Sequence, residues 1–438
     1  MKSLLRIIVV AVMCATCVRQ ISPAQPEPAK GVKKTCGLAD ILGVTHVAGK
    51  YYLTDKDFLN EGADQILALG SRVIKVWFHN PQRSYPFNSQ WPDMNSLVHI
   101  AQSPYFRKLF NKPFTTYIMM CLSTGRAAGY WRNGITEQQK LDEQRQFYEL
   151  TRHLLTTYKG TGKTFVLQHW EGDWLIRGNY DKNIDPTPAA VNAMIEWLNA
   201  RQMGVNQARQ EVGQQAAKVY HAAEVNRVVS SMKQRKPNVV NMVLPHTELD
   251  LVSYSAWDST TEHSENPQVF REALDFISAN MPDSPGFGSR NVYVGEFGMP
   301  ASKFSAEQIQ KAIPNAVETA LDWRCPYIVY WQLYCNELKD RQEKLPVSGN
   351  DAVRGFWLIR PDGSKSWVWH YFHQLLNANA SRTAQTGRHG KIEKKVSSFM
   401  AASTQIDIVL SLRQRRRCHL PYGAPSPPLL SQQDCRFL

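Results

Sequence analysis

Two glutamates stand directly at the ends of apolar runs in this 438-residue chain. Glu171 lies in "HWEGDW" (169–174), which follows the run "TFVLQ", and Glu296 lies in "VYVGEFGMP" (292–300). A carboxyl group beside a buried segment is unfavourable unless it is paired or used, so both positions suggest a function. If the two groups face one another across a gap, one can act as a nucleophile and the other as a general acid, which is the chemistry that cleaves glycosidic bonds.

Eight apolar runs, each bounded by turn residues, predict the strands that would position these groups. Strands that are apolar throughout and are each followed by a segment of helical spacing are typical of parallel pairing with both faces of the sheet covered. The predicted strands span residues 41–47, 72–78, 114–122, 164–170, 217–225, 249–257, 291–297 and 327–334. Glu171 therefore follows the fourth strand, and Glu296 ends the seventh.

Segments with helical apolar spacing alternate with these strands. They span residues 55–70, 95–110, 136–158, 187–204, 224–234, 266–281, 305–323 and 367–378. Eight strand–helix units predict an α/β fold, a closed (β/α)8 TIM barrel, over residues 38–379. The competing fold, an open doubly wound sheet, usually carries a GxGxxG loop after its first strand, and "THVAGKYYLTD" (45–55) has no such loop.

Polar and aromatic side chains gather where the predicted strands end. The active site of a (β/α)8 barrel forms at the carboxyl ends of its strands, because the loops there converge. We therefore expect Glu171 and Glu296 to be catalytic and the following residues to bind the substrate: His46, Trp77, His79, His169, Trp170, Asp173, Glu224, Asn226, Tyr254, Trp257 and Trp331.

The motif "GEFG" and the positions of the two glutamates resemble the clan A glycoside hydrolases, which are retaining (β/α)8 enzymes that include many cellulases and mannanases. The resemblance covers roughly residues 38–378. It implies that Glu171 is the acid/base and Glu296 the nucleophile of a double displacement on a β-linked oligo- or polysaccharide. It also implies that Tyr254 orients the nucleophile, that Trp331 forms the floor of the sugar subsite, and that no metal or organic cofactor is needed.

One position departs from the pattern of that superfamily. Trp170 stands immediately before Glu171, where the superfamily usually has an asparagine that binds the sugar 2-hydroxyl. His169, Asn226 or Asp173 could supply this contact instead, or Asp173 could itself be the acid. Aromatic rings are expected to raise the pKa of Glu171 by desolvation.

A cation is expected to keep Glu296 ionised, with Lys75 and Arg126 as the candidates.

Two other functions remain open from the sequence. A non-catalytic barrel could use the aromatic cleft only to bind carbohydrate. A metal-dependent hydrolase or isomerase could use the imidazoles and carboxylates at the strand ends. The sequence has no HExxH motif or HxH pair. The candidate metal ligands are His46, His79, His169, His221, Asp173 and Glu224.

The first residues have the pattern of a secretory signal peptide. Basic Lys2 and Arg6 precede an apolar stretch over 7–18, and small residues follow near Ala24. We expect a signal peptide over 1–24, a linker over 25–37 and a secreted or periplasmic protein that leaves no membrane anchor. In such a compartment Cys36, Cys121, Cys325 and Cys335 could form disulfides, with three pairings open.

The positive charge of the chain lies mostly at its ends. The net charge is +13, of which residues 1–24 carry +3 and residues 380–438 carry +7, so that +3 remains for residues 25–379. This distribution argues against nucleic acid as a partner of the barrel. Residues 380–438 are expected to form a basic, disordered tail, and the protein is expected to be a monomer.

Overall fold

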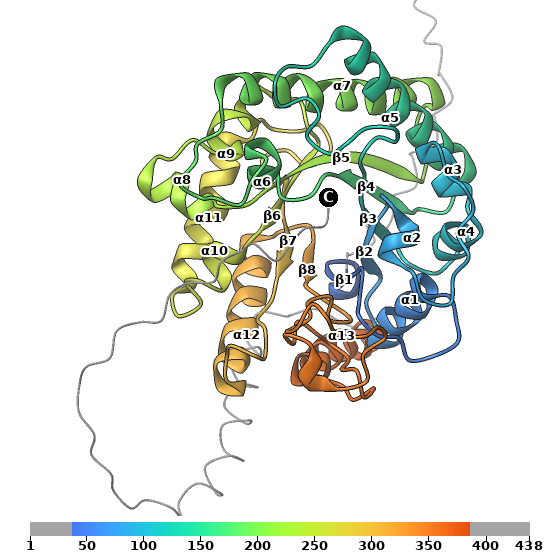
Figure 1. The fold of residues 1–438 in the computed structure, drawn as a ribbon, viewed down its shortest axis with the longest axis vertical. Helices are drawn as coiled ribbons and strands as arrows, with labels where there is room; N and C mark the ends of the chain where they lie inside the picture. The colour runs from blue at the N-terminus through green and yellow to red at the C-terminus, as the bar shows by residue number, and fades with distance from the viewer. Residues whose placement is uncertain (1–36, 386–438) are drawn as a thin grey trace, which may run out of the picture. The chain divides into compact units, whose positions relative to one another are not determined.

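The computed structural model describes residues 37–385, with side chains described over 37–377. Eight parallel strands close into a barrel in the order of the sequence (Figure 1), with β1 hydrogen-bonded to both β2 and β8. The predicted (β/α)8 fold is therefore confirmed. The strands are β1 Leu42–His46, β2 Val73–Trp77, β3 Thr116–Met120, β4 Thr164–Gln168, β5 Lys218–Val225, β6 Leu251–Ser255, β7 Val292–Phe297 and β8 Ile328–Tyr330.

Helices surround the barrel, as Figure 1 shows. They are α1 Phe58–Leu69, α2 Pro81–Ser84, α3 Leu97–Gln102, α4 Pro104–Phe110, α5 Glu137–Thr157, α6 Gly172–Arg177, α7 Pro188–Val212, α8 Val228–Gln234, α9 Val239–Met242, α10 Trp257–Thr260, α11 Pro267–Asn280, α12 Ala306–Trp323 and α13 Trp367–Gln385. Three short 3-10 helices, at Leu38–Asp40, Leu244–His246 and Asn350–Ala352, complete the described elements.

Helix boundaries follow local sequence signals. Asp57 caps α1 by accepting a hydrogen bond from the backbone of Asn60, and Gly70 ends the helix with a φ of 102°, a left-handed conformation that suits glycine. The single helix predicted over 95–110 is wrong. It is divided into α3 and α4 at Ser103, because Pro104 lacks an N–H group and pushes the preceding residue into extended backbone.

The barrel interior is filled by one side chain from most strands. Val73, Ile118, Val166, Ala222, Leu251, Tyr293 and Val329 belong to one buried cluster, which Tyr327 joins just before β8. These residues alternate along each strand with others that pack against the helices. The interior is thus a packed core, and functional groups are held above it, toward the carboxyl ends of the strands.

Several predictions concern the two ends of the chain. The predicted signal peptide and all of the predicted linker except Gly37 lie outside the described residues. Helix α13 runs to Gln385, past the limit predicted for the barrel, and the rest of the predicted tail lies outside the described range. Cys121, Cys325 and Cys335 are buried free thiols, while Cys36 also lies outside that range.

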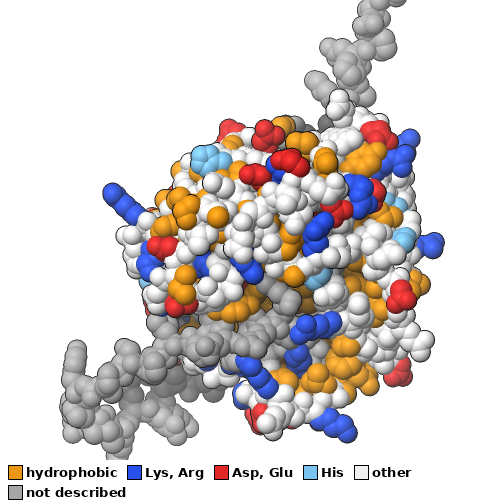
Figure 2. Space-filling model, turned by 45° about the horizontal axis from the view of Figure 1, so that its top comes forward, with side chains coloured by type: hydrophobic (Ala, Val, Ile, Leu, Met, Phe, Trp, Pro, Cys, Tyr) orange, Lys and Arg blue, Asp and Glu red, His pale blue; other side chains and the backbone are white. Residues whose placement is uncertain are grey.

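The described surface has mixed charge. Figure 2 shows basic and acidic side chains interspersed with uncharged ones on the face presented. This is the pattern of an ordinary solvent-exposed surface. Within residues 37–385, no helix has the length and hydropathy that crossing a bilayer requires.

Candidate active site

The carboxylate of Glu296 points into the barrel because of an irregularity in β7. Tyr293 lies inside the barrel, so regular alternation would place Gly295 inside and Glu296 outside. The register between β6 and β7 shifts between the pairs Tyr254–Val294 and Ser255–Glu296, and such a bulge re-aims the side chain that follows it. Glu296 Oε1 consequently lies 2.8 Å from Lys75 Nζ, across the barrel on β2.

Two donors hold the Glu296 carboxylate. Lys75 binds one oxygen, and Trp257 Nε1 donates to the other at 3.2 Å. Burial raises the pKa of Glu296 to about 7, and the Lys75 ammonium and the Trp257 hydrogen bond oppose this rise. Lys75 is thus the cation expected from the sequence. Arg126, the other candidate, lies 3.4 Å from Asp142.

Glu171 begins helix α6 in an unusual backbone conformation. Its φ is 25° and its ψ is 74°, values that a non-glycine residue adopts only under strain. Its backbone N–H donates to Glu224 Oε1 at 3.0 Å. Among the described residues, no side chain hydrogen-bonds its carboxyl group. Strain of this kind concentrates at functional sites, which favours Glu171 over an ordinary loop residue.

The protonation of the two glutamates differs. Burial raises the pKa of Glu171 well above its ordinary value, and the negative charges of Glu296 and Glu224 add to the rise. Glu296 has a Lys75 ammonium in contact, whereas Glu171 has no such partner. Glu171 therefore holds its proton to higher pH than Glu296. Two carboxyl groups whose environments separate their pKa values in this way can act as an acid and an ionised nucleophile.

The raised pKa of Glu171 makes stability depend on pH. A carboxyl group that binds its proton more tightly in the folded state stabilises the fold below its ordinary pKa of 4.5, and this contribution is lost as the pH rises toward the folded pKa. We expect Glu171→Gln, which is neutral at every pH, to raise Tm by a few degrees at pH 7.5 and to leave it nearly unchanged at pH 4. Thermal unfolding at the two pH values tests this, and an equal change at both would contradict it.

Three indole rings lie near the carboxylate of Glu296 and its partner Lys75. The ring centroids of Trp77 and Trp331 are 5.7 Å apart, and those of Trp257 and Trp331 are 6.5 Å apart. Lys75 Nζ lies 5.4 Å from the Trp77 ring. Strand β2, the residue after β8 and the first residue of α10 therefore bring indole rings to the region of the Glu296 carboxylate. Trp170 lies apart from this group, with its ring 6.5 Å from that of Tyr180.

Two of the predicted site histidines belong to the wall of the barrel. His46 Nε2 lies 2.8 Å from the carbonyl oxygen of Phe58, and its ring packs against α1 so closely that a Cβ on Gly62 would lie 2.4 Å away. The ring of His169 lies 5.5 Å from that of Trp197 in α7. Burial lowers the pKa of both to about 4. The expectation that His46 and His169 bind substrate is wrong, because both face the helices.

Tyr254 also faces the helices. Its hydroxyl donates to Asp258 Oδ1 at 2.6 Å, and its ring lies 6.2 Å from that of Phe270 in α11. The neighbouring Ser253 points into the barrel, so alternation turns Tyr254 outward. The structure therefore corrects the expectation that Tyr254 orients Glu296, since the indole of Trp257 makes that contact.

Asp173 and Asn226 hydrogen-bond each other's backbone at the ends of β4 and β5. Asp173 is fully buried and accepts hydrogen bonds from the backbone of Asn226 at 3.0 Å and of Val239 at 2.9 Å, with Arg177 at 3.2 Å. Asn226 Oδ1 in turn accepts from the backbone of Asp173 at 3.0 Å. These contacts exclude Asp173 as the acid. His79 lies just beyond β2, where its Nε2 contacts Asn80 Nδ2 at 2.9 Å.

The predicted role of Glu224 as a substrate contact is wrong as well. Its side chain is fully buried, and both of its oxygens are occupied by neighbours. Oε1 accepts from the backbone of Glu171, and Oε2 lies within hydrogen-bond distance of Lys75, Gln168 and Ser253. Sequence reasoning missed Gln168 and Ser253, although each is a polar residue in a mostly apolar strand.

The described histidines do not converge as a metal site would require. His221 contacts Phe147 of α5, so it too faces the helices and lies on the opposite side of β5 from Glu224. Over the described part of the chain, no group of three or more histidine, cysteine, aspartate or glutamate side chains is arranged to hold a metal ion. The ligand set considered for a metal-dependent barrel is therefore not assembled by these residues.

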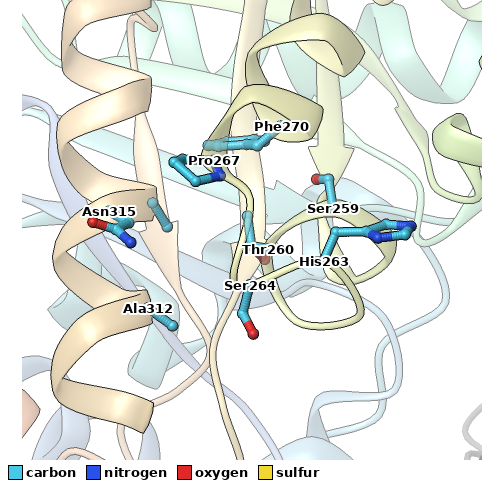
Figure 3. A pocket seen from close by; sticks show the side chains of 9 residues that line it. Ser259, Thr260, His263, Ser264, Pro267, Phe270, Ala312 and Asn315 are labelled. Carbon is cyan, nitrogen blue, oxygen red and sulfur yellow. The ribbon is translucent and has the colours of Figure 1, made fainter. Parts of the chain in front are cut away.

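Two small crevices lie away from the paired glutamates. One separates α10 and α11 from α12 and is lined by Pro267, Phe270, Ala312 and Asn315 among others (Figure 3). The other lies beside the buried ion pair between Glu143 and Arg201, which joins α5 to α7. Neither is lined by Glu171 or Glu296, so the candidate site is assigned from the converging carboxyl, ammonium and indole groups.

The known proteins found to be similar to this chain are solved structures. No family model matches the sequence, and no curated protein matches it. A β-glucuronidase from Bacteroides uniformis is similar at 12% identity and a TM-score of 0.45, over 76% of this chain and 34% of that one. The chain thus spans about a third of the length of that protein.

Two further solved structures are similar to this chain over a larger share of their own length. A GH5_18 protein from Bifidobacterium longum subsp. infantis is 14% identical with a TM-score of 0.49, over 77% of this chain and 79% of that one. A glycoside hydrolase 5 lichenase mutant from Caldicellulosiruptor sp. F32, solved in complex with cellotetraose, is 12% identical with a TM-score of 0.44, over 78% and 94% of the two chains.

Proposed function

We propose that this protein is an exported, divergent clan A glycoside hydrolase that cleaves β-linked oligo- or polysaccharides with retention of configuration. The observation that carries the proposal is the convergence of Glu171 and Glu296 on one network with Lys75, beside the rings of Trp77, Trp257 and Trp331. Carboxyl groups supply the acid and the nucleophile, and indole faces supply stacking surfaces for pyranose rings.

The reaction divides into two steps. Glu296 attacks the anomeric carbon while Glu171 gives its proton to the leaving oxygen, so that the glycosidic bond breaks and a covalent ester forms on Glu296. A water molecule then attacks the anomeric carbon of the ester and gives its proton to Glu171, so that the bond between this carbon and Glu296 breaks and the sugar is released. Lys75 favours the ionised form of Glu296 before the attack.

A panel of chromogenic β-glycosides and polysaccharides tests the proposal. Turnover that persists in a chelator and is abolished in both Glu171→Gln and Glu296→Gln is expected. Binding to a polysaccharide without turnover would instead indicate a non-catalytic carbohydrate-binding barrel. Activity lost on chelation would indicate a metal-dependent enzyme. Because export rests on the sequence of residues 1–24, the N-terminus of the mature protein from culture medium or periplasm tests it separately.

A further inference from the structure

We infer that Glu224 is a positioning residue that ties both proposed catalytic glutamates to one buried anchor. One of its carboxylate oxygens fixes the backbone at Glu171, and the other fixes Lys75, which in turn holds Glu296. The inference rests on the proposed function, since it assigns Glu224 a role in the same reaction.

The anchor is rigid because every partner is fixed. Lys75 Nζ, Gln168 Nε2 and Ser253 Oγ lie 2.9, 2.6 and 2.7 Å from Glu224 Oε2, and all of these side chains are fully buried. Gln168 also accepts a hydrogen bond from Tyr293, which lies in the barrel core. Direct contacts therefore reach the Glu224 carboxylate from β2, β4 and β6, and β7 supports it through Gln168, so the barrel fixes its position.

Glycines beside both proposed catalytic residues make room for this anchor. Gly172 follows Glu171, and a Cβ there would lie 2.6 Å from the carbonyl oxygen of Glu224. Gly295 precedes Glu296, and a Cβ there would lie 1.8 Å from Ser253 Oγ and 2.9 Å from Glu224 Oε2. Both segments thus need glycine because each closes directly on Glu224 or on the serine that holds it.

The reaction gives this arrangement a purpose. In the first step, negative charge leaves Glu296 as its ester forms and appears on Glu171 as it loses its proton. Lys75 then has no charged partner in Glu296, but it keeps Glu224 at 2.9 Å. Glu224 consequently compensates the buried ammonium through the whole cycle, while the backbone bond holds Glu171 in its strained conformation.

The negative charge of Glu224 also affects the pKa values of both proposed catalytic glutamates. It raises the pKa of Glu171 and that of Glu296, in each case in addition to the effect of burial. Glu224→Gln removes that charge. Both limbs of the bell-shaped pH profile of kcat/KM, which report the acid and the base of the free enzyme, should therefore move to lower pH by about one unit or more.

A matched control separates this effect from general damage. Glu143 is also fully buried and pairs with an arginine at 2.7 Å, but it lies between α5 and α7. Glu143→Gln removes a comparable ion pair and should leave the pH limbs in place. A pH profile of kcat/KM for Glu224→Gln with both limbs at their wild-type positions would overturn the inference. Turnover that survives in Glu171→Gln or Glu296→Gln would instead overturn the proposed function, so the two failures are distinguishable.

A second pair of variants covers the case in which Glu224→Gln fails to fold. Ser253→Ala removes one hydrogen bond to Glu224 Oε2 and keeps all charges. Its kcat should fall several-fold while KM is maintained. Ser71→Ala is the control, because Ser71 is equally buried and hydrogen-bonded but lies before β2, at the opposite end of the barrel. A wild-type kcat in Ser253→Ala would overturn the inference.

Discussion

Glu296→Gln is expected to lower kcat/KM for a hydrolysable β-glycoside on the order of 10⁴-fold or more, because an amide cannot attack the anomeric carbon. The amide also has to place its NH2 group against one of two donors, the Lys75 ammonium or the Trp257 indole N–H, so ground-state geometry is disturbed as well. Steady-state kinetics on the substrate found with the glycoside panel measure the loss.

Glu143→Gln serves as the control for this experiment too, since it removes a buried carboxylate without touching the proposed site. Glu296→Ala should in addition regain turnover in azide, because the shortened side chain leaves room for an external nucleophile. Loss of activity in Glu143→Gln equal to that in Glu296→Gln would contradict a catalytic role for Glu296, as would a Glu296→Gln variant with wild-type kcat/KM.

Lys75→Met is expected to destabilise the fold by about 3–5 kcal/mol, the typical cost of removing one partner of a buried ion pair. Lys75 is fully buried, 2.9 Å from Glu224 and 2.8 Å from Glu296. Its removal leaves two carboxylates without compensation, so the deficit should be larger at pH 8 than at pH 5, where Glu296 is protonated. Activity at neutral pH should also fall, because Glu296 would no longer be kept ionised.

Denaturant unfolding at pH 5 and pH 8 measures this effect. Lys56→Met provides the comparison, since Lys56 is exposed and pairs with Asp64 at 3.1 Å on the surface. A pair of that kind contributes about 0–1 kcal/mol. Wild-type stability of Lys75→Met at both pH values would show that the buried network does not have the energetic role assigned to it.

The strands could be predicted because each is a continuous apolar run. Every observed strand lies within its predicted range, from Leu42–His46 to Ile328–Tyr330. Helix α6, which begins immediately after Glu171, was not predicted. Its six residues carry too short a pattern to show helical spacing, and its start depends on the contact between Glu171 and Glu224, which the sequence does not display.

The direction of each side chain was harder to predict than its position along the strand. Lys75 could be recognised as a candidate because a lysine inside an apolar strand is costly without partners. Trp257 holds Glu296 in place of Tyr254, because alternation along β6 turns Tyr254 toward the helices. His46 and His169 stand near the ends of predicted strands, but the alternation of side chains along a strand turns both imidazole rings toward the helices.

Covalent trapping tests the central claim most directly. A 2-deoxy-2-fluoro derivative of the hydrolysed β-glycoside, with a good leaving group, should accumulate as an ester on the nucleophile of a retaining enzyme. Proteolysis and mass spectrometry should locate a single adduct on Glu296. An adduct on Glu171, Glu224 or another residue, or hydrolysis with inversion and no adduct, would contradict the assignment of Glu296 as the nucleophile.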